Sequence, residues 1–382
     1  MENSRKARRK QGKRKRTWLK ILLIVVAVLL VIVLAVGAVV NSYLNKISYD
    51  DPYEKTKVTG DILTDAVSSI TEGVGDMPEP LPKLEPLHDP DEQEPTQEEN
   101  AFDLSKLGEF QDELRHWCAN GDPVASKRVI NILLIGMDNA DEDLRVNGRA
   151  DAMVLISINT ESGQIKMTSL LRDAYAYVVN DGAEAFEKMH MSILRAGPSL
   201  LIQTIERHYK IQIDNYIAVN RASFPEVIDT IGGIDIDLTQ EEADALGLYP
   251  GYQTLDGNTA MRYARIRRID SDYARTGRHQ AVLLAILEKA KSCDLPQMLE
   301  MIDALLPHVR TGMTKSDIIA MGTRALTSGW LKYDVTTQTF PLDNHRQPQT
   351  IDSLFYWIVD YPHAARDLQM SLYGTTNISL QE

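Results

Sequence analysis

The chain has 382 residues, of which 43% are hydrophobic and 25% are charged, a composition typical of a globular protein with one large domain or two ordinary ones. Its formal net charge of −13 is unevenly spread, because residues 1–20 carry ten Lys or Arg against one Glu, a local +9 that leaves −22 for the rest. This split indicates a chain that faces two different environments. Cys118 and Cys293 have neither CxxC nor zinc-ligand spacing, so a disulfide and two unpaired buried thiols both stay open.

Residues 21–40, ILLIVVAVLLVIVLAVGAVV, form a run of twenty residues without a polar side chain. A helix of that length spans ~30 Å, which is the thickness of the hydrocarbon core of a bilayer. We therefore predict a basic cytoplasmic tail over residues 1–17 and a single-pass anchor in the cell membrane over residues 18–43, with Trp18 and Tyr43 as interfacial aromatics. The basic N-terminal side predicts that the rest of the chain is extracytoplasmic.

Two other interpretations of this N-terminal region carry less weight. A cleaved signal peptide has an apolar core of only ~7–15 residues and a small-residue cleavage site. A basic run is also a pattern of nucleic-acid binding. Here it lies directly against the anchor, where membrane topology and attraction to anionic lipid explain it, and no recognition helix accompanies it. We therefore expect membrane lipid, and not nucleic acid, as the partner of this region.

Residues 44–127 are predicted to form an acidic, proline-rich extracytoplasmic spacer, densest in PEPLPKLEPLHDPDEQEPTQEE at residues 78–99. Such a composition buries too little apolar surface to offset the entropy lost on ordering, so it favours an extended chain. A short amphipathic segment follows near residues 104–117.

From Val129 onward, apolar runs of strand length alternate with segments of helical periodicity. The predicted strands are 129–136, 152–159, 164–171, 215–220 and 234–238, the second and third joined as a hairpin by a Glu-Ser-Gly turn at 161–163. The predicted helices are 199–209, 223–231 and one that begins near Ala274. This alternation predicts an α/β fold in which helices cover a sheet, with a single domain over residues 128–375 and a C-terminal tail over 376–382.

The stretch RIRRIDSDYARTGRHQ, residues 265–280, places five arginines in an otherwise acidic chain. Its first part is expected to continue the preceding element, LDGNTAMRYA. Arg275 and Arg278 are three residues apart and would share one face in the first turn of the following helix, where free backbone N–H groups and the helix dipole attract anions. Guanidinium groups match phosphate oxygens in a planar fork. The alternative is a solvated charged face in which Asp270 and Asp272 are ordinary ion-pair partners.

A second group of charged residues lies at the ends of predicted strands. Asp138 follows the first strand in IGMDN, Arg149 and Asp151 lead into the second in GRADA, and Arg172 and Asp173 end the third in LLRDAY. If these strands are neighbours, the side chains gather at one edge of the sheet, where open α/β sheets bind ligands. Two carboxylates there suit Mg²⁺, which takes one or two from protein and completes its shell with water and phosphate. The alternative for each aspartate alone is a turn residue or a helix cap.

At these residues the chain resembles a known family, the LytR-CpsA-Psr proteins of bacterial cell envelopes. The matching pieces occur in family order and run to about Lys291, with a weaker likeness from TGMTKSDIIAMG toward Gly374. They are NILLIGMD, GRADAMVLISI, TSLLRDAY, VIDTIGGIDIDL, LDGNTAMRYARIR and DSDYARTGRHQ. The membrane anchor with its short basic tail is similar as well.

The resemblance implies an α-β-α sandwich with a central mixed sheet and a long apolar pocket for a polyprenyl chain. It also implies an enzyme, a phosphotransferase that moves a cell-wall glycopolymer such as teichoic acid or capsule from a polyprenyl-diphosphate carrier to a peptidoglycan hydroxyl. Diphosphate cleavage would be a side activity. The alternative is a non-catalytic protein that binds polyprenyl phosphate or wall polymer, against which the pair Asp138 and Asp151 argues, since pure binding needs no metal.

Carried over residue by residue, the resemblance assigns Asp138 and Asp151 to Mg²⁺, with Mn²⁺ as a substitute. The diphosphate would be bound by a set of basic and amide side chains: Arg149, Arg172, Arg265, Arg267, Arg275, Arg278, Lys188 and Gln280. The residues expected to act in catalysis are Arg149, Asp151, Arg172, Asp173 and Asp272. Asp272 would orient the arginines or help to deprotonate the acceptor hydroxyl.

The chain departs from the family pattern at four uncharged positions. Leu171 stands where a proline is common, Ala150 and Ala152 stand where Ser and Thr are common, and Ala274 stands where a glycine is common. All four changes leave the ionic groups in place, so they bear on loop geometry more than on activity.

Overall fold

The computed structural model describes seven stretches of the chain, all within one compact unit, residues 48–382. They are residues 48–49, 81–84, 102–138, 147–222, 224–266, 272–292 and 309–380. Within these stretches no helix is long and apolar enough to cross a membrane. The predicted tail and anchor, residues 1–43, and most of the predicted spacer lie outside the described residues.

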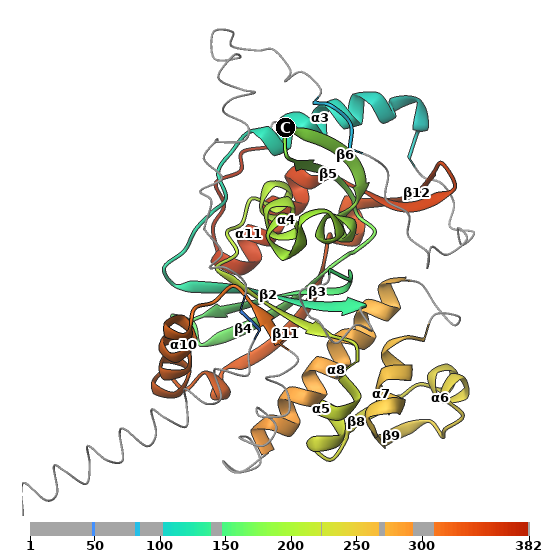
Figure 1. Ribbon diagram of the computed structural model, residues 1–382, viewed down its shortest axis with the longest axis vertical. Coiled ribbons are helices and arrows are strands. Elements are labelled where there is room, and N and C mark those ends of the chain that lie inside the picture. The colour runs from blue at the N-terminus through green and yellow to red at the C-terminus, as the bar shows by residue number, and fades with distance from the viewer. Residues whose placement is uncertain are drawn as a thin grey trace, which may run out of the picture. The chain divides into compact units, whose positions relative to one another are not determined.

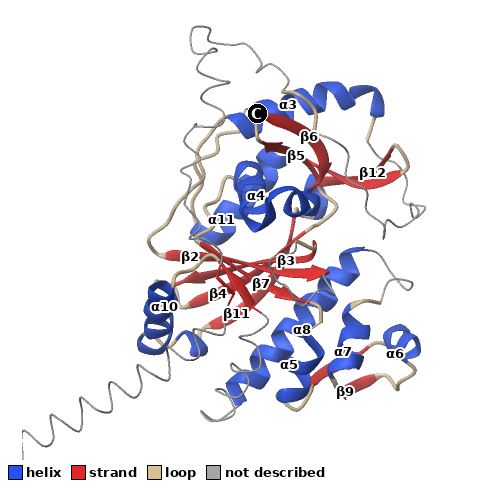
Figure 2. Ribbon diagram, in the orientation of Figure 1, coloured by secondary structure: helices blue, strands red, loops and turns tan. Residues whose placement is uncertain are grey.

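A mixed sheet occupies the centre of the described chain (Figures 1 and 2). Its strands, in spatial order, are β1 (Ser48–Tyr49), β10 (Val309–Thr311), β7 (Asn215–Asn220), β2 (Val129–Asp138), β3 (Arg149–Asn159), β4 (Gln164–Leu170) and β11 (Asp334–Phe340). β2 pairs parallel with β7 and antiparallel with β3, β3 pairs antiparallel with β4, and β4 pairs parallel with β11. The predicted α/β class with a central mixed sheet is therefore confirmed.

Four of the predicted strands form in this sheet at nearly the predicted positions. β2 and β3 are longer than expected and reach Asp138 and Arg149, which brings both side chains into the sheet. The predicted hairpin is present as β3 and β4, and Gly163 in its turn has a φ of +67°, a conformation that costs a glycine little. Long β-branched and aliphatic runs with buried side chains explain why these segments extend.

One layer covers the sheet on the side that carries α3, α4 and α11 in Figure 1. Its elements are η1 (Leu104–Lys106), α3 (Leu107–Ala119), β5 (Tyr175–Asn180), β6 (Ala183–Lys188), η2 (Met189–Met191), α4 (Ser192–Tyr209), η5 (Asp343–His345), β12 (Arg346–Ile351), β13 (Leu354–Val359) and α11 (Tyr361–Tyr373). Alternate side chains of β2, among them Leu133, Ile135 and Met137, join these elements in the main hydrophobic core.

The amphipathic segment near residues 104–117 forms η1 and α3, as predicted. Leu114 and Cys118 of α3 are buried in the main core. Residues 102–127, which the sequence assigned to the spacer, therefore belong to the folded unit. A run of only thirteen helical residues between an acidic stretch and a strand carries too weak a signal to place that boundary.

The other face of the sheet is covered by a smaller group of elements. They are α5 (Phe224–Thr230), β8 (Ile234–Leu238), α6 (Gln240–Leu246), β9 (Gly251–Leu255), α7 (Gly257–Ala264) and α8 (Asp272–Ser292), with a hydrophobic core of their own. The predicted strand 234–238 is present, but it pairs with β9 in a separate hairpin and not with the central sheet. α10 (Lys315–Thr327) and η4 (Trp330–Lys332) pack beside the sheet near Ile132 and Ile158.

The arginine block starts where a helix ends. α7 stops at Ala264, and the backbone N–H of its C-cap residue Arg265 donates to the carbonyls of Arg262 and Tyr263. The prediction that the block continues the preceding element is therefore wrong at Arg265. The helix predicted to begin near Ala274 is present as α8, which begins two residues earlier than expected.

Candidate functional site

The carboxyl ends of three strands meet at one edge of the central sheet. β7 and β4 run in the same direction as β2, while β3 runs in the opposite direction and starts at that edge. Asp138 at the end of β2 therefore lies beside Arg149 at the start of β3, and Arg172 follows the end of β4. The strand-end cluster expected from the sequence is present as a set of buried ion pairs.

Asp138 is the centre of the first set of ion pairs. Its side chain is only 5% exposed. Arg149 donates to Oδ2 at 2.8 Å, Arg221 approaches Oδ1 at 2.8 Å, and Arg265 approaches the same oxygen at 3.5 Å. Three guanidinium groups from β3, from the loop after β7 and from the end of α7 thus surround one carboxylate. The negative charge of Asp138 allows these arginines to lie close together despite their mutual repulsion.

Asp151 owes its position to a β-bulge. Gly136 pairs with Ala152 and Met137 pairs with Ala150, so Asp151 is the extra residue of β3 at this point. Such bulges change the direction of a side chain and occur next to active sites. Arg172 donates to Oδ1 of Asp151 at 3.0 Å.

A second set of ion pairs begins at Arg172. Its Nε lies 3.3 Å from Oδ2 of Asp173, and the ammonium of Lys188 lies 3.3 Å from Oδ1 of the same carboxylate. Nδ1 of His190 lies 3.8 Å from that oxygen. Asp173 therefore joins the arginine after β4 to the lysine that ends β6, and both basic groups are more than nine-tenths buried.

Asp138 and Asp151 line the polar end of an apolar cavity of about 320 Å³, on the face of the sheet that α5, α7 and α8 cover. One wall is the sheet, with Leu134, Gly136, Ala152, Val154 and Val219. The opposite wall comes from Phe224 of α5, Met261 and Ala264 of α7, and His279, Val282, Leu283 and Ile286 of α8. Arg221 and Arg265 also line it, beside Asp138 and Asp151.

The sequence explains why this space is open. Residues 279, 282, 283 and 286 repeat at i, i+3, i+4 and i+7, so one stripe of α8 faces the sheet. On the facing strands stand the small residues Gly136 and Ala152, and a Cβ on Gly136 would lie only 3.1 Å from Cβ of Ala152. Small side chains opposite an apolar helix stripe leave an apolar volume that the side chains in the described part of the chain do not fill.

Two further predicted residues lie on α8 and point elsewhere. Arg278 is 3% exposed, and its Nη2 donates to the carbonyl of Ile266 at 2.7 Å, which ties the loop after α7 to α8. The amide of Gln280 donates to Oγ of Ser169 at 2.9 Å and to the carbonyl of Gln338 at 2.8 Å. Gln280 thus connects α8 to β4 and β11, and its role at a diphosphate stays a prediction.

The remaining predicted residues cannot be placed as side chains. Arg267 lies outside the described residues, and the side chains of Asp272 and Arg275 in the first turn of α8 lie outside them too. Their roles stay predictions.

Arg221 belongs to the site and was missed by sequence reasoning. It directly follows β7, and its backbone N–H donates to the carbonyl of Met137, which ties this loop to the end of β2. The strand-end argument that selected Asp138 applies equally to a residue after β7. The local sequence does not encode the parallel pairing of β7 with β2, which is what brings Arg221 to this edge of the sheet.

Asp138 and Asp151 fit a divalent cation in the type of their donors. Mg²⁺ needs one or two protein carboxylates when phosphate and water complete its shell, and both aspartates border the same cavity. Among the described residues no group of three or more His, Cys, Asp or Glu could hold a metal, so a cation here would depend on ligand oxygens. The arginines on Asp138 would share its two oxygens with such a cation.

A family model and named relatives match this sequence. A model of the LytR_cpsA_psr family matches residues 91–370. A protein from Oceanobacillus iheyensis, named polyisoprenyl-teichoic acid–peptidoglycan teichoic acid transferase TagU, is 32% identical over 242 residues, which cover 61% of this chain and 72% of that protein. A protein of the same name from Bacillus anthracis is 27% identical over 250 residues, which cover 64% and 78%.

Solved structures share the fold. One is described as TagT bound to LIIa-WTA, with a TM-score of 0.53, 22% identity and coverage of 65% of this chain and 91% of that chain. Another, from Streptococcus agalactiae, has a TM-score of 0.55, 19% identity and coverage of 66% and 91%. The family match spans most of the chain and the fold agrees with it, so the resemblance seen in the sequence is confirmed: the chain belongs to the LytR_cpsA_psr family.

Proposed function

We propose that this protein is a phosphotransferase that moves a wall glycopolymer of the teichoic acid type from a polyprenyl-diphosphate carrier to a peptidoglycan hydroxyl. The observation that carries the proposal is the apolar cavity with Asp138, Asp151, Arg221 and Arg265 at its polar end. A diphosphate with a long hydrocarbon tail has the matching distribution of charge and apolar surface. The named relatives are transferases of this class, which supports the enzyme reading over a binding protein.

The apolar cavity would bind the lipid chain, and the arginines of the ion pairs would bind the phosphates. The apolar walls would take up part of the polyprenyl chain, which gains roughly 25 cal/mol for each Å² of apolar surface removed from water. The arginines would bind the non-bridging phosphate oxygens and stabilise the charge that develops on them. Since phosphoryl transfer needs little covalent help from the protein, positioning and electrostatics are sufficient for catalysis.

The proposed reaction is a substitution at the phosphorus that carries the glycopolymer. The oxygen of the acceptor hydroxyl forms a new bond to this phosphorus, and the bond from phosphorus to the bridging oxygen breaks. Polyprenyl phosphate leaves with the bridging oxygen, and a carboxylate of the site takes the hydroxyl proton. Asp272 is our candidate for this base, on the strength of the family resemblance alone.

A magnesium ion would be held by Asp138 and Asp151, with manganese as a substitute. When bound, it would neutralise charge on the diphosphate and on the departing phosphate. Arg149 and Arg172 donate to these carboxylates, and on the strength of the family resemblance they would also bind the phosphate oxygens. The negative charge of the diphosphate would thus be compensated by the cation and by the arginines around Asp138 and Asp151.

A membrane anchor over residues 18–43 completes the proposal. It would keep the folded domain on the outer side of the cell membrane, beside a lipid-linked donor. The basic tail, residues 1–17, would stay in the cytoplasm, next to anionic lipid.

The test is a transfer assay with the full-length protein, a labelled polyprenyl-diphosphate saccharide and a peptidoglycan oligosaccharide as acceptor. We expect transfer with Mg²⁺, none with a chelator, and none from Asp151→Asn, while Arg172→Ala should lose roughly 10²–10³-fold in rate because one electrostatic contact to the phosphate is removed. Asp235→Asn, an exposed carboxylate on β8 away from the cavity, is the matched control and should keep its activity. Binding of the donor without transfer or diphosphate cleavage would instead support the non-catalytic alternative.

A further inference from the structure

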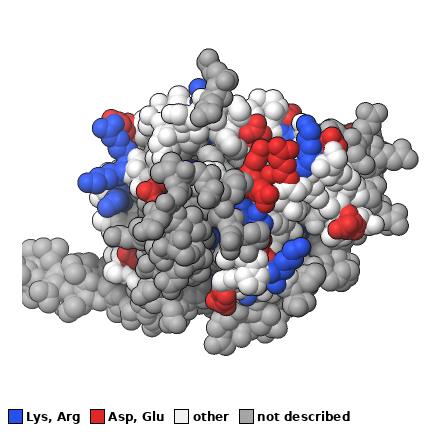
Figure 3. All heavy atoms as spheres, turned by 90° about the horizontal axis from the view of Figure 1, so that it is seen from above, with Lys and Arg blue, Asp and Glu red and all other residues white. Residues whose placement is uncertain are grey.

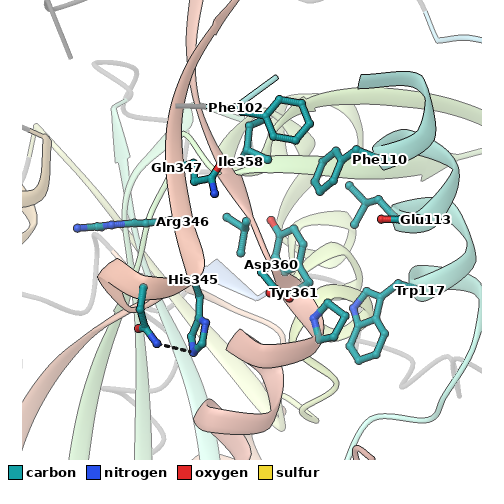
Figure 4. Close-up of a pocket in the computed structure, with 14 residues that line it drawn as sticks. Phe102, Phe110, Glu113, Trp117, His345, Arg346, Gln347, Ile358, Asp360 and Tyr361 are labelled. Carbon is teal, nitrogen blue, oxygen red and sulfur yellow. Dashed lines mark hydrogen bonds between the residues drawn. The ribbon is translucent and has the colours of Figure 1, made fainter. Parts of the chain in front are cut away.

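A second cavity, of about 360 Å³, lies in the layer that contains α3 and α11 (Figure 4). Figure 1 shows this layer on the other side of the sheet from α8, which lines the cavity beside Asp138 and Asp151. One wall is formed by Phe102, which lies before η1, and by Phe110, Glu113 and Trp117 of α3. The other is formed by residues 344–347 and 358–362, from η5, β12, the end of β13 and the start of α11. No residue of this cavity takes part in the site described above, so it is available for a separate ligand.

Aromatic rings form the first wall and are held in place. Phe102 and Phe110 are half-buried and meet edge to face, with ring centroids 5.5 Å apart. Nε1 of Trp117 donates to the carbonyl of His208 at 2.9 Å, and the ammonium of Lys210 lies 4.9 Å from the centre of the indole ring. The wall is therefore apolar and preorganised, and binding would cost little side-chain entropy.

Polar groups face the same space from both walls. Figure 4 shows the carboxylate of Glu113 and the amide of Gln347 directed toward the space between α3 and β12. Both side chains belong to exposed residues, and neither has a hydrogen-bond partner among the residues that the structure describes. They can thus accept and donate hydrogen bonds to a ligand that lies against the aromatic rings.

Two basic residues that line this cavity, His345 and Arg346, already face carboxylates. Nε2 of His345 lies 2.9 Å from Asp367, and Arg346 pairs with Asp343 and lies over the ring of Trp357 at 4.5 Å. In Figure 4 the guanidinium of Arg346 extends away from the cavity. The charge presented to a ligand is therefore negative, which disfavours phosphate groups.

The face around α3 has the same sign. Glu109, Asp112 and Glu113 of α3 are all exposed. Figure 3, which views the molecule from the side on which α3 lies in Figure 1, shows an acidic patch on that side with Lys or Arg side chains next to it. A polyanion approaching this face would meet repulsion, whereas a neutral molecule would not.

We infer that this cavity binds a neutral saccharide unit. A pyranose ring has apolar C–H faces, which pack on aromatic rings, and hydroxyl groups, which bind carboxylates and amides. A cavity of this size suits a small ligand such as one or two sugar rings. If the proposed function is right, the saccharide belongs to the peptidoglycan acceptor and not to the anionic polymer of the donor.

Such a site would raise the local concentration of the acceptor. A glycan strand held at α3 stays attached to the protein while another part of the same strand meets the arginine site, so the second encounter becomes intramolecular. The two cavities would then divide donor and acceptor between the two faces of the sheet.

The experiment measures binding of a neutral tetrasaccharide of N-acetylglucosamine to the purified full-length protein by calorimetry. We expect binding that weakens at least tenfold in Phe110→Ala, in Glu113→Ala and in Gln347→Ala, and no binding of an anionic polyglycerol phosphate polymer. Glu109→Ala, one turn earlier on α3 and outside the cavity, is the matched control and should bind like the wild type. Glu113 and Gln347 are exposed, so their variants test the site even if Phe110→Ala fails to fold.

The outcome can be separated from that of the transfer assay. Asp151→Asn should abolish transfer and still bind the tetrasaccharide with unchanged affinity. No binding by the wild type, or binding that survives all three cavity substitutions, would overturn the inference. If the wild type binds the saccharide in this cavity but shows no transferase activity, the saccharide site stands. Only the statement that the saccharide belongs to the acceptor of a transfer reaction would then be wrong.

Discussion

Asp138 holds three arginines that are far apart in the sequence. Arg149, Arg221 and Arg265 come from three different segments and meet at its two oxygens. A buried carboxylate requires such partners, since an unpaired buried charge is costly, and the arginines in turn require the carboxylate. Under the proposed function, the oxygens of a diphosphate would take over part of this pairing, and Arg149, which is already buried, would need little further desolvation. The cluster is thus assembled before the ligand arrives.

Arg221 should contribute to donor binding and transfer. Replacing it with Gln removes one of the guanidinium groups at the cavity, and because its side chain is 35% exposed we expect a modest loss, about tenfold in kcat/KM for the donor. Arg221→Lys should retain part of the activity, since the charge remains but the planar fork is lost. Steady-state kinetics at varied donor concentration measures kcat/KM for the donor in both variants.

Arg128→Gln is the control for the arginine substitution. Its side chain is 71% exposed and pairs with Glu161 at the β3–β4 turn, away from the cavity. Equal kinetics for Arg221→Gln and Arg128→Gln would show that Arg221 has no role at the donor.

The question left open by the two cysteines is answered for one of them. Cys118 is a free thiol buried in the main core, and burial raises its pKa to about 12. Since the thiolate is the reactive form, this thiol is inert at neutral pH. Cys293 lies outside the described residues.

At the level of elements, the contact between α5 and α7 sets the shape of one cavity wall. The backbone N–H of Gly257 donates to Asp229 at 2.7 Å, and Asp256 caps α7 by accepting from the N–H of Thr259 at 2.7 Å. A Cβ on Gly257 would lie 2.1 Å from the carbonyl oxygen of Pro225. Only glycine allows the two helices to approach so closely.

Gly257→Ala should therefore destabilise the fold. The added methyl group must push α5 and α7 apart, at a cost of about 3 kcal/mol in the free energy of unfolding, as for an overpacked core. Gly322→Ala is the control, because nothing lies within 4 Å of its Cβ in the interior of α10, and there alanine should add about 1 kcal/mol of stability. Urea unfolding measures both. A Gly257→Ala protein as stable as the wild type would contradict the close packing of these helices.

At the level of the whole molecule, His208 of α4 connects this helix to β5 and α11 in the layer that also contains α3. Its Nδ1–H donates to the carbonyl of Thr204 at 2.6 Å, its Nε2 accepts from the N–H of Tyr177 at 3.0 Å, and its ring packs on Tyr361. Burial lowers its pKa to about 3, so the imidazole stays neutral in the folded protein. The folded structure requires the neutral imidazole, because Nε2 must accept the hydrogen bond from Tyr177.

This pKa predicts a loss of stability in mild acid. Between the unfolded pKa of 6.5 and the folded pKa of about 3, the unfolded chain binds a proton that the folded protein does not, so stability falls as the pH falls. The loss from this group should reach about 2 kcal/mol at pH 5. Urea unfolding at pH 7 and pH 5 measures it. His208→Gln should be less stable at pH 7 but should lose less on acidification, and an unchanged pH dependence in this variant would contradict the assignment.

The sequence by itself determined the family, the fold class and most of the strands. Apolar runs and helical periodicity are local properties, and so is the position of Asp138 or Arg172 at the end of a strand. These features survive in the structure because burial of alternating or periodic side chains is what stabilises each element. The arginines of residues 265–280 were recognisable for the same reason, as a local excess of charge.

Only the tertiary structure decided which of these residues meet. The parallel pairing of β7 with β2 brings Arg221 to Asp138, and the bulge at Asp151 depends on a register between two strands. The direction of Gln280 toward β4 and β11 depends on how α8 packs against the sheet. Pairing and packing are fixed by contacts between segments far apart in the chain, and no local pattern encodes them. The aromatic cavity at α3 has the same origin, because its two walls are more than two hundred residues apart.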